Sequence, residues 1–153
     1  MSRYCFIANY YLTPLQSALA RRLTTHGIRV CWIVVNTRLA QILEDDGWPR
    51  EHTLHLRLDT PSPDQSFTAV PLKFHDLLHA DRALRHRPKT GMRYLNAAAH
   101  AIHAFLERER PDFVFGENTW AHERLAAALC AASGGARQYL APHTVRFPSG
   151  RWG

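Results

Sequence analysis

The fold of this chain is decided by residues 3–35, which read RYCFIANYYLTPLQSALARRLTTHGIRVCWIVV. Residues 3–9 contain an apolar run without alternation, which is typical of a strand buried on both faces. Thr13 and Pro14 then begin a helical pattern that ends at Gly27, and residues 29–35 form a second apolar run. Two buried strands joined by a helix predict a parallel β-α-β unit.

The rest of the chain continues this alternation of strands and helices. A short helix is expected at residues 36–47, followed by a strand at 52–58 whose alternating leucines place it at or near a sheet edge. Beyond it we expect helices at 71–84, 92–108 and 120–133, strands at 112–115 and 138–141, a loop at 59–69 and a basic, exposed connection at 85–91. This order predicts an α/β fold, with a Rossmann-like parallel sheet and helices on both faces.

The domain organisation follows from the length and the last expected strand. A chain of 153 residues is typical of one domain, and we expect that domain to span residues 1–141. Residues 142–153 have no strand or helix pattern, and the sequence stops at Gly153 within an aromatic, glycine-rich segment. We therefore expect an irregular C-terminal segment and an interrupted sequence.

The composition narrows the class of protein. An apolar fraction of 46% and a charged fraction of 21% are ordinary for a globular domain, and the longest apolar runs are too short for a transmembrane segment. Three cysteines in apolar patterns predict buried reduced thiols and a cytoplasmic protein. The net charge of +6 comes almost wholly from scattered arginines, so we expect solvated helix faces and no nucleic-acid partner.

Several common site motifs are missing from the sequence. The loop after the first expected strand has no glycine-rich dinucleotide fingerprint, and neither a P-loop nor a Gly-x-Ser-x-Gly elbow occurs elsewhere. The histidine pairs His75/His79 and His100/His103 lack the cysteine or third-ligand context of a zinc site. We therefore expect neither a cofactor nor a metal.

The richest group of polar side chains follows the expected strand at 112–115. Glu117, Asn118, Thr119 and His122 lie where this strand turns into a helix, and Gly116 allows a ligand to approach the backbone closely. Ligands in parallel sheets bind at the carboxyl ends of the strands, which makes this turn a candidate site.

The same turn has a structural interpretation. Asn118 or Thr119 fits the N-cap of the following helix, with Glu123 as a favourable first-turn carboxylate. The free N–H groups of that helix N-terminus would also suit a phosphate or a carboxylate. Glu117 has no capping role, so we assign it to a site.

Two further strand-end loops hold candidate binding residues. The Tyr10–Tyr11 pair offers flat rings that could stack on a sugar, although one ring packed on the first helix is an equally physical account. His143 and Arg146 follow the last expected strand, where the arginine could bind a phosphate or carboxylate or simply lie in a surface loop.

The motifs at residues 112–153 resemble bacterial capsular or exopolysaccharide biosynthesis proteins of the GT-B glycosyltransferase type. The resemblance rests on a strand followed by Gly-Glu-x-Thr-Trp-Ala-His-Glu, an alanine-rich helix, and Tyr-Leu-x-Pro-His-Thr-x-Arg-Phe-Pro-x-Gly-Arg. It implies an N-terminal domain that receives a saccharide or lipid-linked saccharide acceptor. A missing or separate domain would bind the nucleotide-sugar donor, so this chain would be inactive alone.

The resemblance also implies roles for the candidate residues. Either Glu117 or His122 would be the general base, His143 and Arg146 would hold phosphate or sugar at the cleft, and Tyr10, Asn118 and Thr119 would contact substrate. A peripheral membrane contact is compatible with such a role. Two other interpretations stay open: a sugar-nucleotide epimerase-like enzyme, and a non-catalytic subunit that docks on a donor domain.

Overall fold

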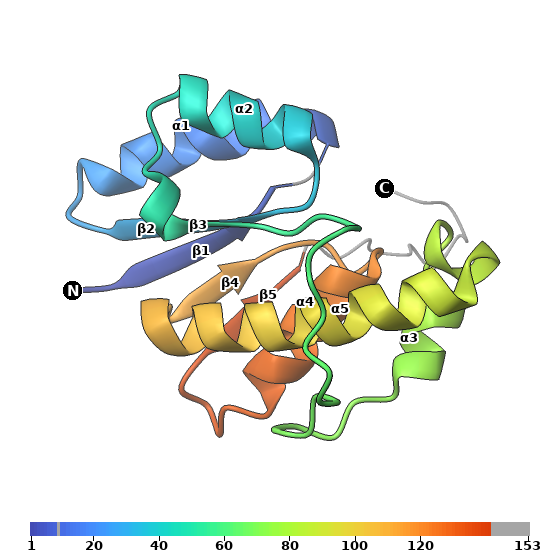
Figure 1. Cartoon of the computed structure of the whole chain (residues 1–153). Helices are drawn as coiled ribbons and strands as arrows, with labels where there is room; N and C mark the ends of the chain where they lie inside the picture. The colour runs from blue at the N-terminus through green and yellow to red at the C-terminus, as the bar shows by residue number, and fades with distance from the viewer. Residues whose placement is uncertain (9, 142–153) are drawn as a thin grey trace, which may run out of the picture.

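A computed structural model, which describes residues 1–8 and 10–141, shows a five-stranded parallel sheet (Figure 1). The strands are β1 (Arg3–Ile7), β2 (Arg29–Val34), β3 (Thr53–His55), β4 (Phe113–Phe115) and β5 (Gln138–Leu140). Their order is β3-β2-β1-β4-β5, and every neighbouring pair is parallel. The predicted Rossmann-like α/β fold is confirmed, and β3 is an edge strand as expected.

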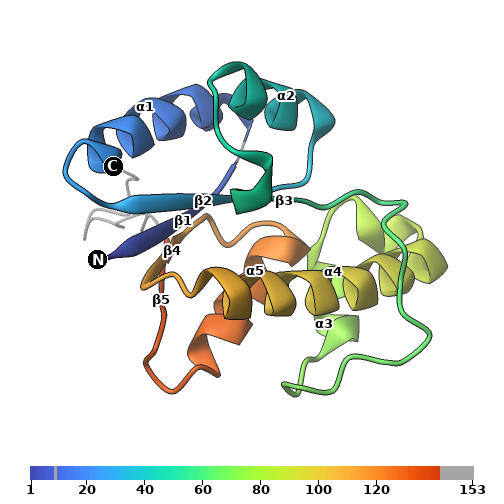
Figure 2. The same ribbon diagram turned by 60° about the vertical axis from the view of Figure 1, so that its left-hand side comes forward.

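Helices cover both faces of the sheet (Figure 2). Helices α1 (Thr13–Thr24) and α2 (Thr37–Asp45) lie on one face, and α3 (Phe74–Ala80), α4 (Pro88–Glu109) and α5 (Ala121–Ala131) lie on the other. The chain also forms three short 3-10 turns, which are η1 (Tyr10–Leu12), η2 (Arg50–His52) and η3 (Leu84–His86).

The pleat of β1 divides the apolar side chains between two cores. Phe6 and Ala8 pack under α1 and α2, whereas Cys5 and Ile7 pack against α4 and α5. Cys5, Cys31 and Cys130 are all buried free thiols, as predicted. The larger core surrounds the apolar face of α4, which is the longest helix with 22 residues.

Two predicted boundaries between residues 71 and 91 are wrong. The helix expected at 71–84 spans only Phe74–Ala80, because Asp81 adopts an extended backbone and its Oδ1 accepts hydrogen bonds from the N–H groups of Ala83 (2.9 Å) and Leu84 (3.0 Å). The connection expected at 85–91 is shorter, because α4 already begins at Pro88. Its Gly91 is buried against Leu78, where a Cβ atom would clash.

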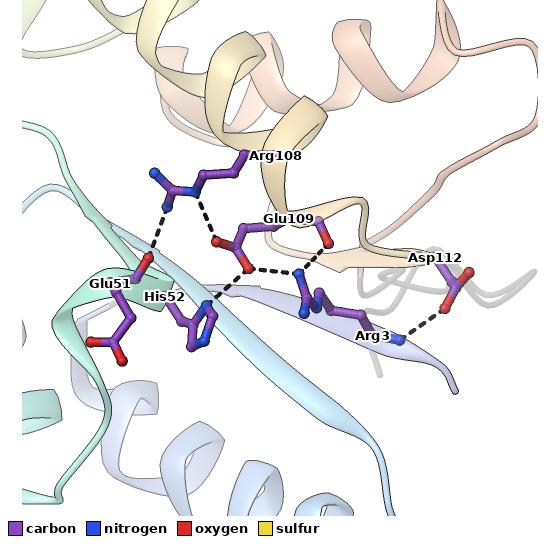
Figure 3. A network of polar contacts seen from close by, with 6 residues as sticks. All are labelled: Arg3, Glu51, His52, Arg108, Glu109 and Asp112. Carbon is purple, nitrogen blue, oxygen red and sulfur yellow. Dashed lines mark hydrogen bonds and ion pairs between the residues drawn. The ribbon is translucent and has the colours of Figure 1, made fainter.

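A buried carboxylate ties three elements together at the amino end of the sheet (Figure 3). Glu109 Oε2 lies 2.8 Å from Arg3 Nη1 and 3.1 Å from His52 Nδ1, and its Oε1 lies 3.0 Å from Arg108 Nε. The network joins the start of β1, the turn before β3 and the end of α4. Because it occupies the edge away from the strand-end loops, we assign it a structural role.

Candidate functional site

The strand order changes direction between β1 and β4, and a cleft of about 300 Å³ opens there at the carboxyl edge. Ligands of open parallel sheets bind at such a switch point. We call this the β1/β4 cleft; it is lined by Phe6, Leu12, Gln16, Phe115, Gly116, Glu117, Leu140 and Ala141. Its walls are mostly apolar, and Glu117 is the one acidic residue among these lining residues.

Glu117 is held in place through its backbone. Its N–H donates to Glu123 Oε1 at 3.1 Å, and its carbonyl accepts a hydrogen bond from the Tyr139 hydroxyl. Glu117 is half-buried, and among the residues that the structure describes its carboxylate receives one contact, a long one of 3.5 Å from the Thr119 hydroxyl. A carboxylate on a fixed backbone, with little internal hydrogen bonding, can take a proton from a ligand in the cleft.

Gly116 is required for packing inside the protein. A Cβ atom at this position would clash with the Tyr139 hydroxyl and come within 3.0 Å of Ile7 Cδ1. The close approach that the sequence suggested for a ligand is therefore made by Tyr139. Burial, followed by the nearby Glu123 carboxylate, raises the pKa of Tyr139, so its hydroxyl stays protonated and continues to donate to Glu117.

The N-terminus of α5 contradicts the prediction of free amides for an external anion. Glu123 is fully buried, and its Oε2 accepts from the N–H groups of Thr119 and Trp120, each at 3.0 Å. Asp81 Oδ2 accepts from the Ala121 N–H at 3.0 Å. The N-cap is Trp120, so the predicted cap at Asn118 or Thr119 is also wrong.

The hydrogen bonds that Glu123 and Asp81 accept from the N–H groups at the start of α5 were not predicted from the sequence. Glu123 had a usable signal, because it stands three residues after the N-cap, where a glutamate commonly accepts from the N-cap N–H. Asp81 had none, because it lies 40 residues from Ala121 in the sequence. Both carboxylates accept hydrogen bonds from N–H groups that the sequence pattern suggested were free to bind a ligand.

His122 opens into a different cleft from Glu117. It lines a space of about 160 Å³ that also lies at the carboxyl edge but on the face covered by α3, α4 and α5. We call this the His122 cleft; it is lined by Val35, Leu56, Leu58, Asp81, Ala83, Leu84, Tyr94, Trp120 and His122. The two alternatives for the general base therefore line separate clefts.

Burial lowers the pKa of His122 to about 4, against a weaker opposing effect of Asp81. The imidazole is therefore neutral at pH 7, and it is a weak base. Glu117 fits the role of general base better, because it lies beside the switch-point cleft and its carboxylate is more accessible.

The depressed pKa of His122 predicts an acid-sensitive fold. Its stabilising contribution is complete above the unfolded pKa of about 6.5 and is lost as pH falls towards 4. Between pH 7 and pH 5 the wild type should lose up to about 2 kcal/mol more unfolding free energy than His122→Leu. Urea unfolding at both pH values measures this, and His26→Leu, at an exposed histidine, should behave as wild type. Equal losses in wild type and His122→Leu would contradict the assignment.

The described binding candidates, Tyr10, Asn118 and Thr119, are not among the residues that line the β1/β4 cleft or the His122 cleft. The Tyr10 ring contacts the Trp120 ring, with centroids 5.7 Å apart. Tyr10 is 52% exposed, and the pKa of its hydroxyl is raised by burial and then by Asp81, Glu123 and Glu117. Asn118 and Thr119 are exposed on the same turn. His143 and Arg146 lie outside the described residues.

Comparisons with known proteins add information on the fold. No protein-family model and no curated protein matches the sequence. Among solved structures, the chain is similar to MurG of Acinetobacter baumannii, with a TM-score of 0.58 and 13% sequence identity. The similarity covers 92% of this chain and 34% of MurG, so the chain spans about a third of that protein's length.

The chain therefore shares the Rossmann-like α/β fold of part of MurG. At 13% identity the similarity shows the fold alone. Among the described residues, no helix is long and apolar enough to cross a membrane, and no group of three or more histidine, cysteine or acidic side chains could hold a metal ion.

Proposed function

We propose that this chain is the acceptor-side domain of a GT-B glycosyltransferase that acts in capsular or surface polysaccharide biosynthesis in the cytoplasm. The observation that carries the proposal is the position of Glu117 beside the cleft at the β1/β4 switch point. The fold similarity to part of MurG supports it. A cleft of about 300 Å³ is also at the lower end of the range for ligand pockets, which suits one sugar unit.

In the proposed reaction an acceptor hydroxyl enters the β1/β4 cleft beside Glu117. The carboxylate takes the hydroxyl proton as the oxygen forms a bond to the anomeric carbon of the donor sugar. The bond from that carbon to the diphosphate breaks, and the nucleoside diphosphate leaves with the electron pair. A separate domain would hold the donor, so the chain alone would bind acceptor without transferring sugar.

Acceptor binding is testable on the chain by itself. In amide NMR spectra, saccharide acceptors from a panel of surface-polysaccharide fragments should shift the signals of Gln16, Gly116 and Glu117, which line the cleft. Nucleotide-sugars should leave these signals unchanged, because their site would lie on the other domain.

A pair of leucine variants locates the binding. Leu140 lines the β1/β4 cleft and is 40% exposed, so Leu140→Arg should obstruct the cleft and abolish the saccharide shifts. Leu58 lines the His122 cleft and is 51% exposed, so Leu58→Arg is a matched control that should bind as wild type. The proposal fails if nucleotide-sugars shift the cleft signals, or if Leu140→Arg binds saccharide normally.

A further inference from the structure

A strongly basic turn precedes α4. We use the name basic turn for residues 82–89, which include Arg82, Arg85, Arg87 and Lys89, all exposed. The sequence has no aspartate or glutamate from residue 82 to residue 106. Among the described residues, none of these four side chains makes an ion pair; Arg85 Nε lies 3.1 Å from His86 Nε2. Within residues 1–8 and 10–141, these four cationic side chains therefore have no carboxylate partner.

Backbone hydrogen bonds fix the path of the basic turn. The Arg85 N–H donates to the Asp81 carbonyl at 3.1 Å, and the Arg87 N–H donates to the Leu84 carbonyl at 2.9 Å. The adjacent carboxylate, Asp81, is only 4% exposed and already accepts three backbone N–H groups. Its carboxylate binds the backbone N–H groups of Ala83 and Leu84 within the turn and of Ala121 at the start of α5, and so it holds the turn in shape.

The start of α4 adds to the same positive field. This helix begins at Pro88, its N-cap Arg87 makes no side-chain cap, and its first turn has no acidic residue. A helix N-terminus carries a partial positive charge that favours anions. The N-terminus of α5 differs, because Glu123 and Asp81 occupy its amides.

The basic turn borders a cleft. Ala83 and Leu84, which belong to the turn, line the His122 cleft together with Trp120 and the buried side chains of Tyr94 and His122. Figure 1 shows α3 and the first turns of α4 at the end of the sheet towards which the strands run. A ligand lying in this cleft can therefore extend onto the cationic turn.

We propose that the basic turn binds a phosphate-bearing ligand, a pyrophosphate group or a phospholipid headgroup, whose uncharged part lies along the His122 cleft. Several arginines on one short turn match the multiple charges of such a group, because each guanidinium can donate two parallel hydrogen bonds to its oxygens. A single short turn is a small footprint for nucleic acid. This binding needs neither donor nor sugar transfer, so its failure is distinct from failure of the proposed function.

Isothermal titration of the chain with inorganic pyrophosphate tests the proposal. Arg82→Ala/Arg87→Ala should weaken pyrophosphate binding about tenfold, because two charge-assisted contacts are lost. Arg22→Ala/Arg29→Ala removes the same charge from exposed positions elsewhere and should change the affinity less than about twofold. Equal weakening by both variants, or no pyrophosphate binding by the wild type together with no vesicle binding, would overturn the proposal.

Vesicle sedimentation distinguishes the two sources of phosphate. Binding to phosphatidylglycerol vesicles, but not to phosphatidylcholine vesicles, with the same loss in Arg82→Ala/Arg87→Ala, supports a lipid headgroup. Binding of soluble pyrophosphate without vesicle binding supports a phosphorylated soluble ligand. A single-stranded RNA bound more tightly than either, with the same loss in the variant, would overturn the proposal in favour of a nucleic-acid surface.

Discussion

Glu117→Gln is expected to lower turnover of the complete transferase about 10²- to 10⁴-fold, the range that a general base contributes. The amide keeps the size of the side chain but cannot accept the acceptor's proton. The backbone contacts of Glu117 with Glu123 and Tyr139 do not involve its side chain, so the fold should be unchanged. The measurement is sugar transfer by this chain combined with its donor domain, with thermal unfolding as the check on folding.

Two further variants make this result specific. Glu117→Asp retains a carboxylate at a shorter reach and should recover part of the lost turnover. Asp64→Asn removes the charge of an exposed carboxylate in the 59–69 loop and should transfer sugar at the wild-type rate. If Glu117→Gln keeps turnover within about twofold of wild type, Glu117 is not the general base, and the catalytic proposal is lost with it.

The fold could be predicted because its strands are apolar along their whole length. In β1 and β2 every residue from Cys5 to Ile7 and from Val30 to Val34 is buried, which leaves no alternation and identifies interior parallel strands. The end of α3 could not be predicted in the same way. It depends on Asp81, whose carboxylate also reaches α5, and such a tertiary contact leaves no local pattern.

The place of Glu117 in the fold could be predicted from the sequence, but its surroundings could not. Placing Glu117 at a strand end required only the order of strands and helices. Two other features depend on the three-dimensional structure: Glu117 and His122 line separate clefts, and internal carboxylates accept from the N–H groups of Thr119, Trp120 and Ala121 at the start of α5. A helix N-terminus has the same sequence pattern whether its anion comes from a ligand or from the protein itself.

Glu123→Ala is expected to lower the free energy of unfolding by about 3–5 kcal/mol. The fully buried carboxylate accepts hydrogen bonds from the N–H groups of Glu117, Thr119 and Trp120, and alanine leaves all three without that acceptor. Urea unfolding of the chain measures the loss. Glu107→Ala removes a glutamate that is 54% exposed and should have little effect, although its carboxylate pairs with Arg137.

Glu123→Gln separates the structural role from an effect on the proposed base. Its carbonyl oxygen can still accept from some of the three N–H groups, while its NH₂ group faces at least one of them as a donor. The loss of stability should therefore be smaller than for alanine, and turnover should still fall because the Glu117 backbone loses its fixed position. If Glu123→Ala instead unfolds like wild type, water or a bound anion satisfies these amides. The N-terminus of α5 would then be an open anion site, as the sequence pattern first suggested.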